Sequence, residues 1–266
     1  MNIRYIVLSA AIFMLFAHFV ACGAQFYQVS MEHDVDAKKE SAESKRIESP
    51  IFGIHSPGGW NELPVKINVG SDLDESQVRG LKAAMKTWEK VVGKQLFDFR
   101  GKEPKSGKNF KDLYSSLQDA VNSNYLRDDW TAGTGKPNTV LATTIWNNNN
   151  GGKIDASDIH FNTQWYRIGD SMTLRADATK EVVDMESLAL HELGHEMGLT
   201  HIQSKDDQYS VMNPSLFIGE GLSFRTVSQG DIERMWKIYG CHHEDKANCD
   251  AKTLHVSLES QHGSKS

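Results

Sequence analysis

The chain has 266 residues, which is enough for one sizeable hydrophobic core. It carries 29 lysine and arginine residues against 35 aspartate and glutamate residues, for a net charge of -6. A protein that binds nucleic acid through its phosphates has a basic stripe. The one short basic run, residues 102–111, is typical of a solvated loop, so we expect no nucleic-acid partner.

The first 21 residues have the composition of a signal peptide. Arg4 precedes an apolar run over residues 5–20, which is short for a membrane span of about 20 apolar residues. The stretch Phe19–Cys22 resembles a bacterial lipoprotein signal, which predicts that Cys22 is acylated and anchors the protein to a membrane. Ordinary cleavage near Ala24 is the alternative. In both cases we expect export, either as a cell-envelope lipoprotein or into the medium.

Residues 22–58 are polar and charged, with few aromatic residues. Such a composition cannot bury a core and indicates a flexible tether. We therefore expect the folded domain to occupy residues 59–240. Its first strand is indicated by the alternating apolar and polar residues of Leu63–Val69.

A helix is predicted after this strand. Asp72 or Asp74 can cap its N-terminus, and Gly93 can end it. Between them, apolar residues recur at the three-and-four spacing of one buried helical face, namely Val78, Leu81, Ala84, Met85, Trp88 and Val92.

The central part of the chain alternates between strand and loop patterns. We predict strands at residues 96–99, 121–127, 140–146 and 158–163. Between the strands we predict a surface loop over 100–111, a short amphipathic helix over 113–121 and a turn over 147–152. A last helix is predicted over residues 229–239. This order indicates an α+β fold in which helices pack on a mixed sheet.

A metal-binding pattern follows Asp184, a candidate helix N-cap. His191 and His195 are four residues apart, so both imidazoles lie on one helical face and can bind one ion. Gly198 suits the left-handed turn that ends a helix, which lets His201 supply a third ligand. We therefore predict a zinc ion held by His191, His195 and His201.

Glu192 lies directly after the first of these ligands. Three neutral imidazoles leave the zinc with a net charge near +2, which lowers the pKa of a bound water to about 7. The fourth zinc position stays open for this water. Glu192 can take the proton of the water as catalytic base and pass it to the leaving nitrogen of a peptide bond. No serine or cysteine nucleophile is needed.

The segment His191–His201, followed by Ser210–Pro214, resembles the metzincin zinc peptidases, and in particular the bacterial relatives of the matrixins. By this resemblance Met212 is the methionine of the Met-turn, a structural turn beneath the zinc. The resemblance covers most of residues 60–240 and implies a catalytic domain with a zincin-like fold. That fold has a twisted five-stranded mixed sheet with one antiparallel edge strand, and three main helices.

The same resemblance implies how a substrate would bind. Residues 140–146 would form the edge strand, whose unpaired backbone groups bind an extended peptide by strand addition. The expected substrate-binding residues are Val140, Leu141, Ala142, Thr143, Thr144 and Pro214. The partner is then a protein or a peptide, and we expect the enzyme to be a monomer.

The chain departs from animal matrixins at their additional metal sites. Thr143 and Thr144 occupy the stretch in which those proteins have a histidine ligand of a second zinc, which leaves His160 alone. Residues 162–164, Asn-Thr-Gln, replace the acidic calcium-binding run. We therefore expect one catalytic zinc, and assign neither a second structural zinc nor calcium.

Residues 241–266 are expected to form a polar C-terminal tail. It contains Cys241 and Cys249, eight positions apart, which can form a disulfide in an exported protein. The alternative is a second metal site built on Cys241, His242 and His243.

We predict a zinc-dependent endopeptidase that hydrolyses peptide bonds in extended protein segments. Two alternatives stay open: a non-catalytic surface protein that binds zinc for structure, and an exopeptidase that trims short peptides. An intact Glu192 and only three apparent ligands disfavour the first, because closed structural zinc sites use four. The second would need a blocked cleft with a group that holds a chain terminus.

Overall fold

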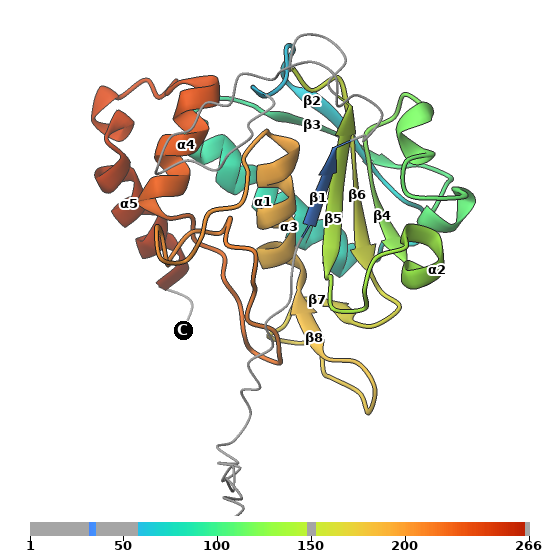
Figure 1. Cartoon of the computed structure of the whole chain (residues 1–266). Coiled ribbons are helices and arrows are strands. Elements are labelled where there is room, and N and C mark those ends of the chain that lie inside the picture. Colours follow the sequence, from blue (N-terminus) through green and yellow to red (C-terminus); the bar gives the residue numbers. More distant parts are fainter. Residues whose placement is uncertain (1–31, 36–57, 148–152, 264–266) are drawn as a thin grey trace, which may run out of the picture.

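A computed structural model describes residues 32–35, 58–147 and 153–263 of the chain (Figure 1). The predicted signal peptide, Cys22 and Ala24 lie outside these ranges, as do residues 148–152 of the predicted turn. Within the described ranges, every helix is too short or too polar to cross a membrane.

The central sheet confirms the predicted α+β fold. Five of its strands come from the predicted domain, and they are β2 (Val65–Val69), β3 (Phe97–Lys102), β4 (Ser123–Arg127), β5 (Ala142–Asn147) and β6 (Ala156–Asn162). They lie in the order β5-β6-β4-β2-β3. β5 runs antiparallel to β6, and the other neighbouring pairs of these strands are parallel. A mixed sheet with one antiparallel strand is what the resemblance implied.

A sixth strand, β1 (Glu32–Val35), pairs in parallel with β5 (Figure 1). Its register runs from Glu32 opposite Thr143 to Val35 opposite Trp146. The interpretation of residues 22–58 as a flexible tether is therefore wrong for β1, and β5 is not the outermost strand of the sheet over Thr143–Trp146. Strand pairing uses main-chain N–H and C=O groups. A polar segment carries the same groups as an apolar one, so its composition does not prevent it from pairing as a strand.

The three main helices are α1 (Glu75–Val92), α3 (Met185–Glu196) and α4 (Gln229–Tyr239). The side chain of Asp74 accepts a hydrogen bond from the amide of Gln77 to begin α1, and Gly93 ends this helix in the left-handed conformation. Asp184 caps α3 in the same way. The predicted positions of these three helices and both of these caps are confirmed.

The helices place α3 at the centre of the molecule. α1 and α3 lie side by side, and α3 also packs against β5 and β6 (Figure 1). Trp88 of α1, which is fully buried, donates a hydrogen bond from its ring nitrogen to the carbonyl of Leu190 at 2.9 Å. Packing against α1 on one side and against β5 and β6 on the other therefore fixes the position of α3, the helix that carries His191 and His195.

Two predictions for residues 97–121 are wrong. β3 continues to Lys102, so the loop begins later than expected. In place of the helix over residues 113–121, this part of the chain has the short 3-10 helix η3 (Ser116–Gln118), after η2 (Gly107–Asn109). The hydroxyl of Ser116 donates to the carbonyl of Leu113, and Asp112 accepts from the amide of Ser115. Such local side-chain bonds compete with helix formation.

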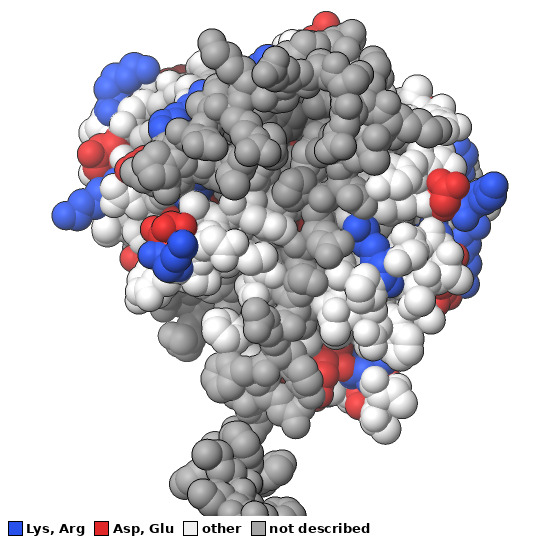
Figure 2. Space-filling view, viewed as in Figure 1, with Lys and Arg blue, Asp and Glu red and all other residues white. Residues whose placement is uncertain are grey.

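The basic run of the predicted loop is neutralised locally. Lys105 pairs with Asp119 at 2.7 Å, and Lys108 pairs with Asp128. On the face drawn in Figure 2, the described lysine and arginine side chains form separate patches, several of them beside aspartate and glutamate. The charge distribution on this face agrees with a solvated surface.

The C-terminal segment is more than a polar tail. After η4 (Lys246–Cys249) it forms the helix α5 (Ala251–Gly263), which packs on α4. Ala251, Leu254 and Leu258 are buried in the core. The prediction missed α5 because these apolar residues at helical spacing stand in an otherwise polar sequence. The remaining short elements are α2 (Trp130–Thr134), β7 (Arg167–Gly169) and β8 (Val182–Asp184).

Candidate metal centre

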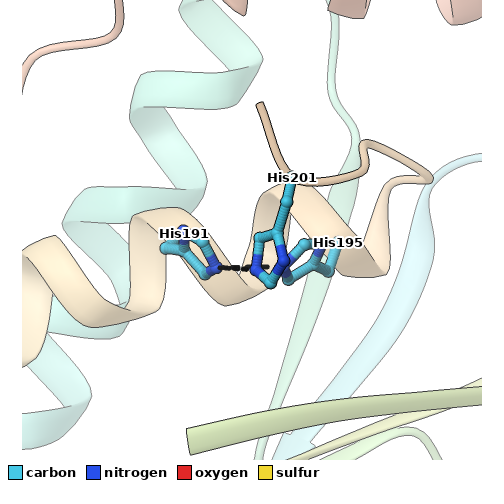
Figure 3. A group of neighbouring side chains, drawn as sticks. All are labelled: His191, His195 and His201. Atoms are coloured by element: carbon cyan, nitrogen blue, oxygen red, sulfur yellow. Dashed lines mark hydrogen bonds between the residues drawn. The ribbon is translucent and has the colours of Figure 1, made fainter. Parts of the chain in front are cut away.

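Three histidine side chains converge at the end of α3 (Figure 3). His191 and His195 come from successive turns of the helix, and His201 comes from the loop after it. The Nε2 atom of His191 lies 2.9 Å from that of His195 and 3.3 Å from that of His201. Within the described residues this is the one group of three metal-ligating side chains whose ligand atoms all lie within 4.8 Å.

The backbone around the centre orients two of the imidazole rings. His191 Nδ1 lies 2.7 Å from the carbonyl of Val211, and His195 Nδ1 lies 2.8 Å from the carbonyl of Leu199. A carbonyl can only accept, so each Nδ1 carries the proton and each Nε2 carries a lone pair. Two lone pairs that face each other repel unless a cation lies between them.

The chemistry of the donor set therefore fits a zinc ion. Imidazole nitrogen is a preferred zinc ligand, and two nitrogen ligands of a tetrahedral zinc lie about 3.4 Å apart. The separation between His191 and His201 is close to this value, and the one between His191 and His195 is shorter. Backbone carbonyls on Nδ1 are the usual outer partners of metal-bound histidines.

The chain turns sharply after α3 to bring the third histidine back. Gly198 has φ +97°, as predicted for a left-handed turn. Its amide donates to the carbonyl of His195, and the amide of Leu199 donates to the carbonyl of Gly194, which closes the helix end. A β-carbon at Gly198 would lie 3.0 Å from the amide nitrogen of Gly59. Glycine is therefore required here by both conformation and space.

Met212 lies in a tight segment next to α3. It is fully buried, and a β-carbon added at Gly194 would lie 2.4 Å from its sulfur atom. The carbonyl of Met212 accepts a hydrogen bond from the amide of Ile202, one residue after His201. The structural position expected for Met212 thus has a physical basis, because this residue supports both the helix and the loop that carries the third histidine.

Glu192 is fully buried and faces β5. The hydroxyl of Thr144 donates to its Oε2 atom at 2.6 Å. Burial raises the pKa of Glu192 to about 8, and the Thr144 hydrogen bond and the charge of Lys136 oppose this shift. A carboxylate with a pKa near neutrality is suited to accept and release a proton.

A second glutamate, Glu196, follows His195 on the same helix. Burial, and next the charge of Asp158, raise the pKa of its carboxyl well above the ordinary value. Neither of its carboxylate oxygens has a hydrogen-bond partner among the described residues. Its backbone carbonyl accepts a hydrogen bond from the ring nitrogen of Trp60 at 2.7 Å. Burial therefore disfavours the charged form of this carboxyl.

The residues predicted to bind substrate are not all at this centre. The side chains at positions 140–144 are buried, and Pro214 is half-buried. Among the predicted substrate-binding residues, Thr144 is the one with a hydrogen bond to Glu192, a contact that the sequence reasoning missed. The antiparallel β5–β6 pair could have suggested which threonine faces α3, but strand register cannot be read from sequence alone.

Two other candidates lie away from the centre. His160 is fully buried in β6, with Nε2 3.1 Å from the hydroxyl of Ser116, and burial lowers its pKa to about 3. Cys241 and Cys249 form a disulfide. The alternative of a metal site on Cys241 is therefore wrong, because a disulfide sulfur is not a thiolate ligand.

The comparison with known families agrees with this geometry. The sequence profile of the matrixin family, Peptidase M10, matches residues 66–240, which is more than half of the chain. No curated protein matches the chain. The matched range contains the three histidines, Glu192 and Met212. The chain therefore belongs to the matrixin family of zinc-dependent metallopeptidases.

Proposed function

We propose that the protein is an endopeptidase in which His191, His195 and His201 hold one zinc ion and Glu192 is the catalytic base. The observation that carries this proposal is the convergence of three Nε2 atoms at the helix that also carries a buried glutamate. A zinc ion bound there would supply Lewis-acid chemistry, which polarises a carbonyl group and makes water more acidic.

The chain's own groups would carry the proton. Glu192 takes a proton from the attacking water and gives it to the nitrogen of the leaving amine. Its place on α3 supports this role, because Glu192 directly follows His191 on the helix that carries the histidine pair and its side chain is shielded from bulk water. The carbonyls of Val211 and Leu199 keep two of the rings in place while this happens.

Extended protein segments would bind along β5. β5 contacts α3 through the side chain of Thr144, which donates to Glu192, so a peptide paired with β5 would pass close to the base. β1 occupies this position in the structure. A substrate strand would therefore take the place of β1, and main-chain hydrogen bonds would provide affinity for many different sequences.

The test is cleavage of a diverse peptide library by residues 25–266, with and without a chelator. We expect internal cleavage, about one zinc per chain by elemental analysis, and loss of activity in Glu192→Gln with zinc retained. Removal of single residues from peptide ends would instead indicate an exopeptidase. Zinc in a protein that cleaves nothing would indicate a binding protein, and cleavage that survives Glu192→Gln would remove the proposed base.

We also propose that the protein is exported and anchored by a lipid on Cys22, which the resemblance of Phe19–Cys22 to a lipoprotein signal supports. Labelling of bacterial cells that express the full chain with a radioactive fatty acid tests this. Label is expected on the wild-type protein and absent from Cys22→Ser. Equal labelling of both proteins, or none on either, would leave ordinary cleavage near Ala24 as the better account.

A further inference from the structure

We propose that Thr144 is a positioning residue for the catalytic base, holding the carboxylate of Glu192 in the orientation that proton transfer needs. This inference rests on the proposed function and assigns to one strand residue a role that strand addition does not require. Strand addition uses the backbone of β5, whereas this role uses a side-chain hydroxyl.

The geometry of the contact is that of a strong hydrogen bond. The Oγ1 atom of Thr144 lies 2.6 Å from Oε2 of Glu192 and 3.1 Å from the backbone carbonyl of the same residue. A hydroxyl has one proton, and the shorter distance identifies Oε2 of Glu192 as its main acceptor. Both side chains are 0% exposed, so solvent does not compete for the bond.

The bond gives the two carboxylate oxygens of Glu192 different roles. Oε2 is held by Thr144, while Oε1 accepts no hydrogen bond from any residue that the structure describes. A glutamate side chain has three rotatable bonds, and its last torsion has a broad energy minimum. Fixing Oε2 removes this freedom and leaves Oε1 as the oxygen available to the reacting proton.

The strand geometry explains why Thr144 makes this contact and Thr143 does not. Successive side chains of a strand point to opposite faces of the sheet. Thr143 is opposite His160 in the β5–β6 register, and Nε2 of His160 lies 3.1 Å from the hydroxyl of Ser116, the first residue of η3. Thr144 points to the other face, where α3 packs. A branched side chain such as threonine also has a restricted χ1 angle, which keeps the hydroxyl in place.

The experiment compares three variants with the wild-type chain of residues 25–266. Thr144→Val removes the hydroxyl and keeps the branched shape, and Thr144→Ser keeps the hydroxyl. Thr87→Val is the matched control, because Thr87 is a buried threonine of α1 whose hydroxyl donates to the carbonyl of Ala83. For each protein, kcat, KM, zinc content and melting temperature are measured. Crystal structures of metal-free wild type and Thr144→Val add a readout that does not depend on activity.

We expect Thr144→Val to lower kcat by about 10- to 100-fold, the range found for residues that orient an active group. KM should change by less than about twofold, and zinc content should stay at the wild-type level, because the variant touches neither the ligands nor the backbone of β5. Thr144→Ser should recover most of the rate, and Thr87→Val should match the wild type. In the Thr144→Val crystal the Glu192 carboxylate should leave its wild-type orientation.

The outcomes separate this inference from the proposed function. A wild-type protein without zinc-dependent cleavage would overturn the proposed function. An active wild type together with a Thr144→Val protein that keeps its kcat would overturn only the role of Thr144. A rise in KM at constant kcat would also overturn it, because Thr144 would then act in substrate binding. An unmoved Glu192 carboxylate in the crystal would do the same.

Discussion

Asp231, in the first turn of α4, accepts a hydrogen bond from the backbone amide of Val211 at 2.8 Å. The carbonyl of Val211 lies 2.7 Å from Nδ1 of His191. Val211 thus links the first turn of α4 to His191, a proposed zinc ligand, through its own backbone amide and carbonyl. The position of the ligand ring depends on the capping of a helix that contributes no ligand.

Asp231→Ala should destabilise the protein and weaken zinc binding together. The carboxylate also accepts from the hydroxyl of Ser210 and pairs with the buried guanidinium of Arg234. Leaving that charge without its closest partner is expected to cost about 3–5 kcal/mol of unfolding free energy. Urea denaturation of zinc-loaded protein measures the loss, and a competition titration measures zinc affinity. Glu233→Gln on the same helix is the control, and an equal change in both variants would contradict the prediction.

Gly194→Ala should destabilise the protein although alanine favours a helix by about 1 kcal/mol. The new β-carbon would lie 2.4 Å from the sulfur of Met212 and 3.2 Å from the ring of Trp88. Overpacking of this kind costs about 1–3 kcal/mol. A double-mutant cycle with Met212→Ala checks the cause, because removing the methionine should relieve most of the penalty. Additive effects of the two substitutions would show that Met212 is not the obstacle.

Asp158→Asn should stabilise the protein above neutral pH. Burial raises the pKa of Asp158 to about 7, against an ordinary value of 3.8. Between these values the folded state holds a proton that the unfolded chain has released, so the unfolding free energy falls as pH rises through this window. The difference between these two pKa values corresponds to at most about 4 kcal/mol of unfolding free energy.

The asparagine keeps an acceptor for the amide of Ser123, which lies 2.8 Å from Oδ1 of Asp158. Thermal unfolding from pH 4 to pH 8 should therefore show a flatter stability profile for Asp158→Asn than for the wild type, with the two curves close together at pH 4. Asp155→Asn, at an exposed position nearby, should follow the wild-type profile. A wild-type stability that does not fall between pH 4 and pH 7 would contradict the raised pKa.

Removal of β1 should lower KM for peptide substrates. β1 pairs with β5 where the proposed substrate strand would lie, so the binding-competent fraction of the protein is reduced while β1 stays bound. A chain that begins at residue 51 is compared with one that begins at residue 25. A third chain keeps the full length but carries Gly-Pro-Gly-Pro at residues 32–35, which cannot form a regular strand. Both altered chains should show a KM several-fold lower, and identical KM values in all three would exclude competition by β1.

The sequence was most informative where the structure of a neighbouring residue or helix turn requires a particular residue type. Asp74 and Gly93 cap α1 as predicted, because capping depends on residues next to the helix end. The histidine spacing likewise predicted the convergence at α3, because the helix itself sets the distance between positions four apart.

Long-range pairing could not be predicted in the same way. Nothing in the composition of Glu32–Val35 indicates that its backbone pairs with β5, and nothing near Thr144 indicates that it faces Glu192. Both facts depend on strand register, which is set by the packing of the whole sheet. The helix α5 was missed for another reason. Few apolar residues mark its buried face, and these residues are buried only because α5 packs against α4.

The position of α5 affects how the domain should be expressed. The family match ends at residue 240, yet Leu254 and Leu258 beyond that point are buried in the same core, and the ring of His255 reaches the carbonyl of Val227 just before α4. A fragment cut at the family boundary would leave an apolar surface on the helix that supports the metal-binding loop, and such surfaces promote aggregation. Recombinant versions of this catalytic domain should therefore extend to at least residue 260.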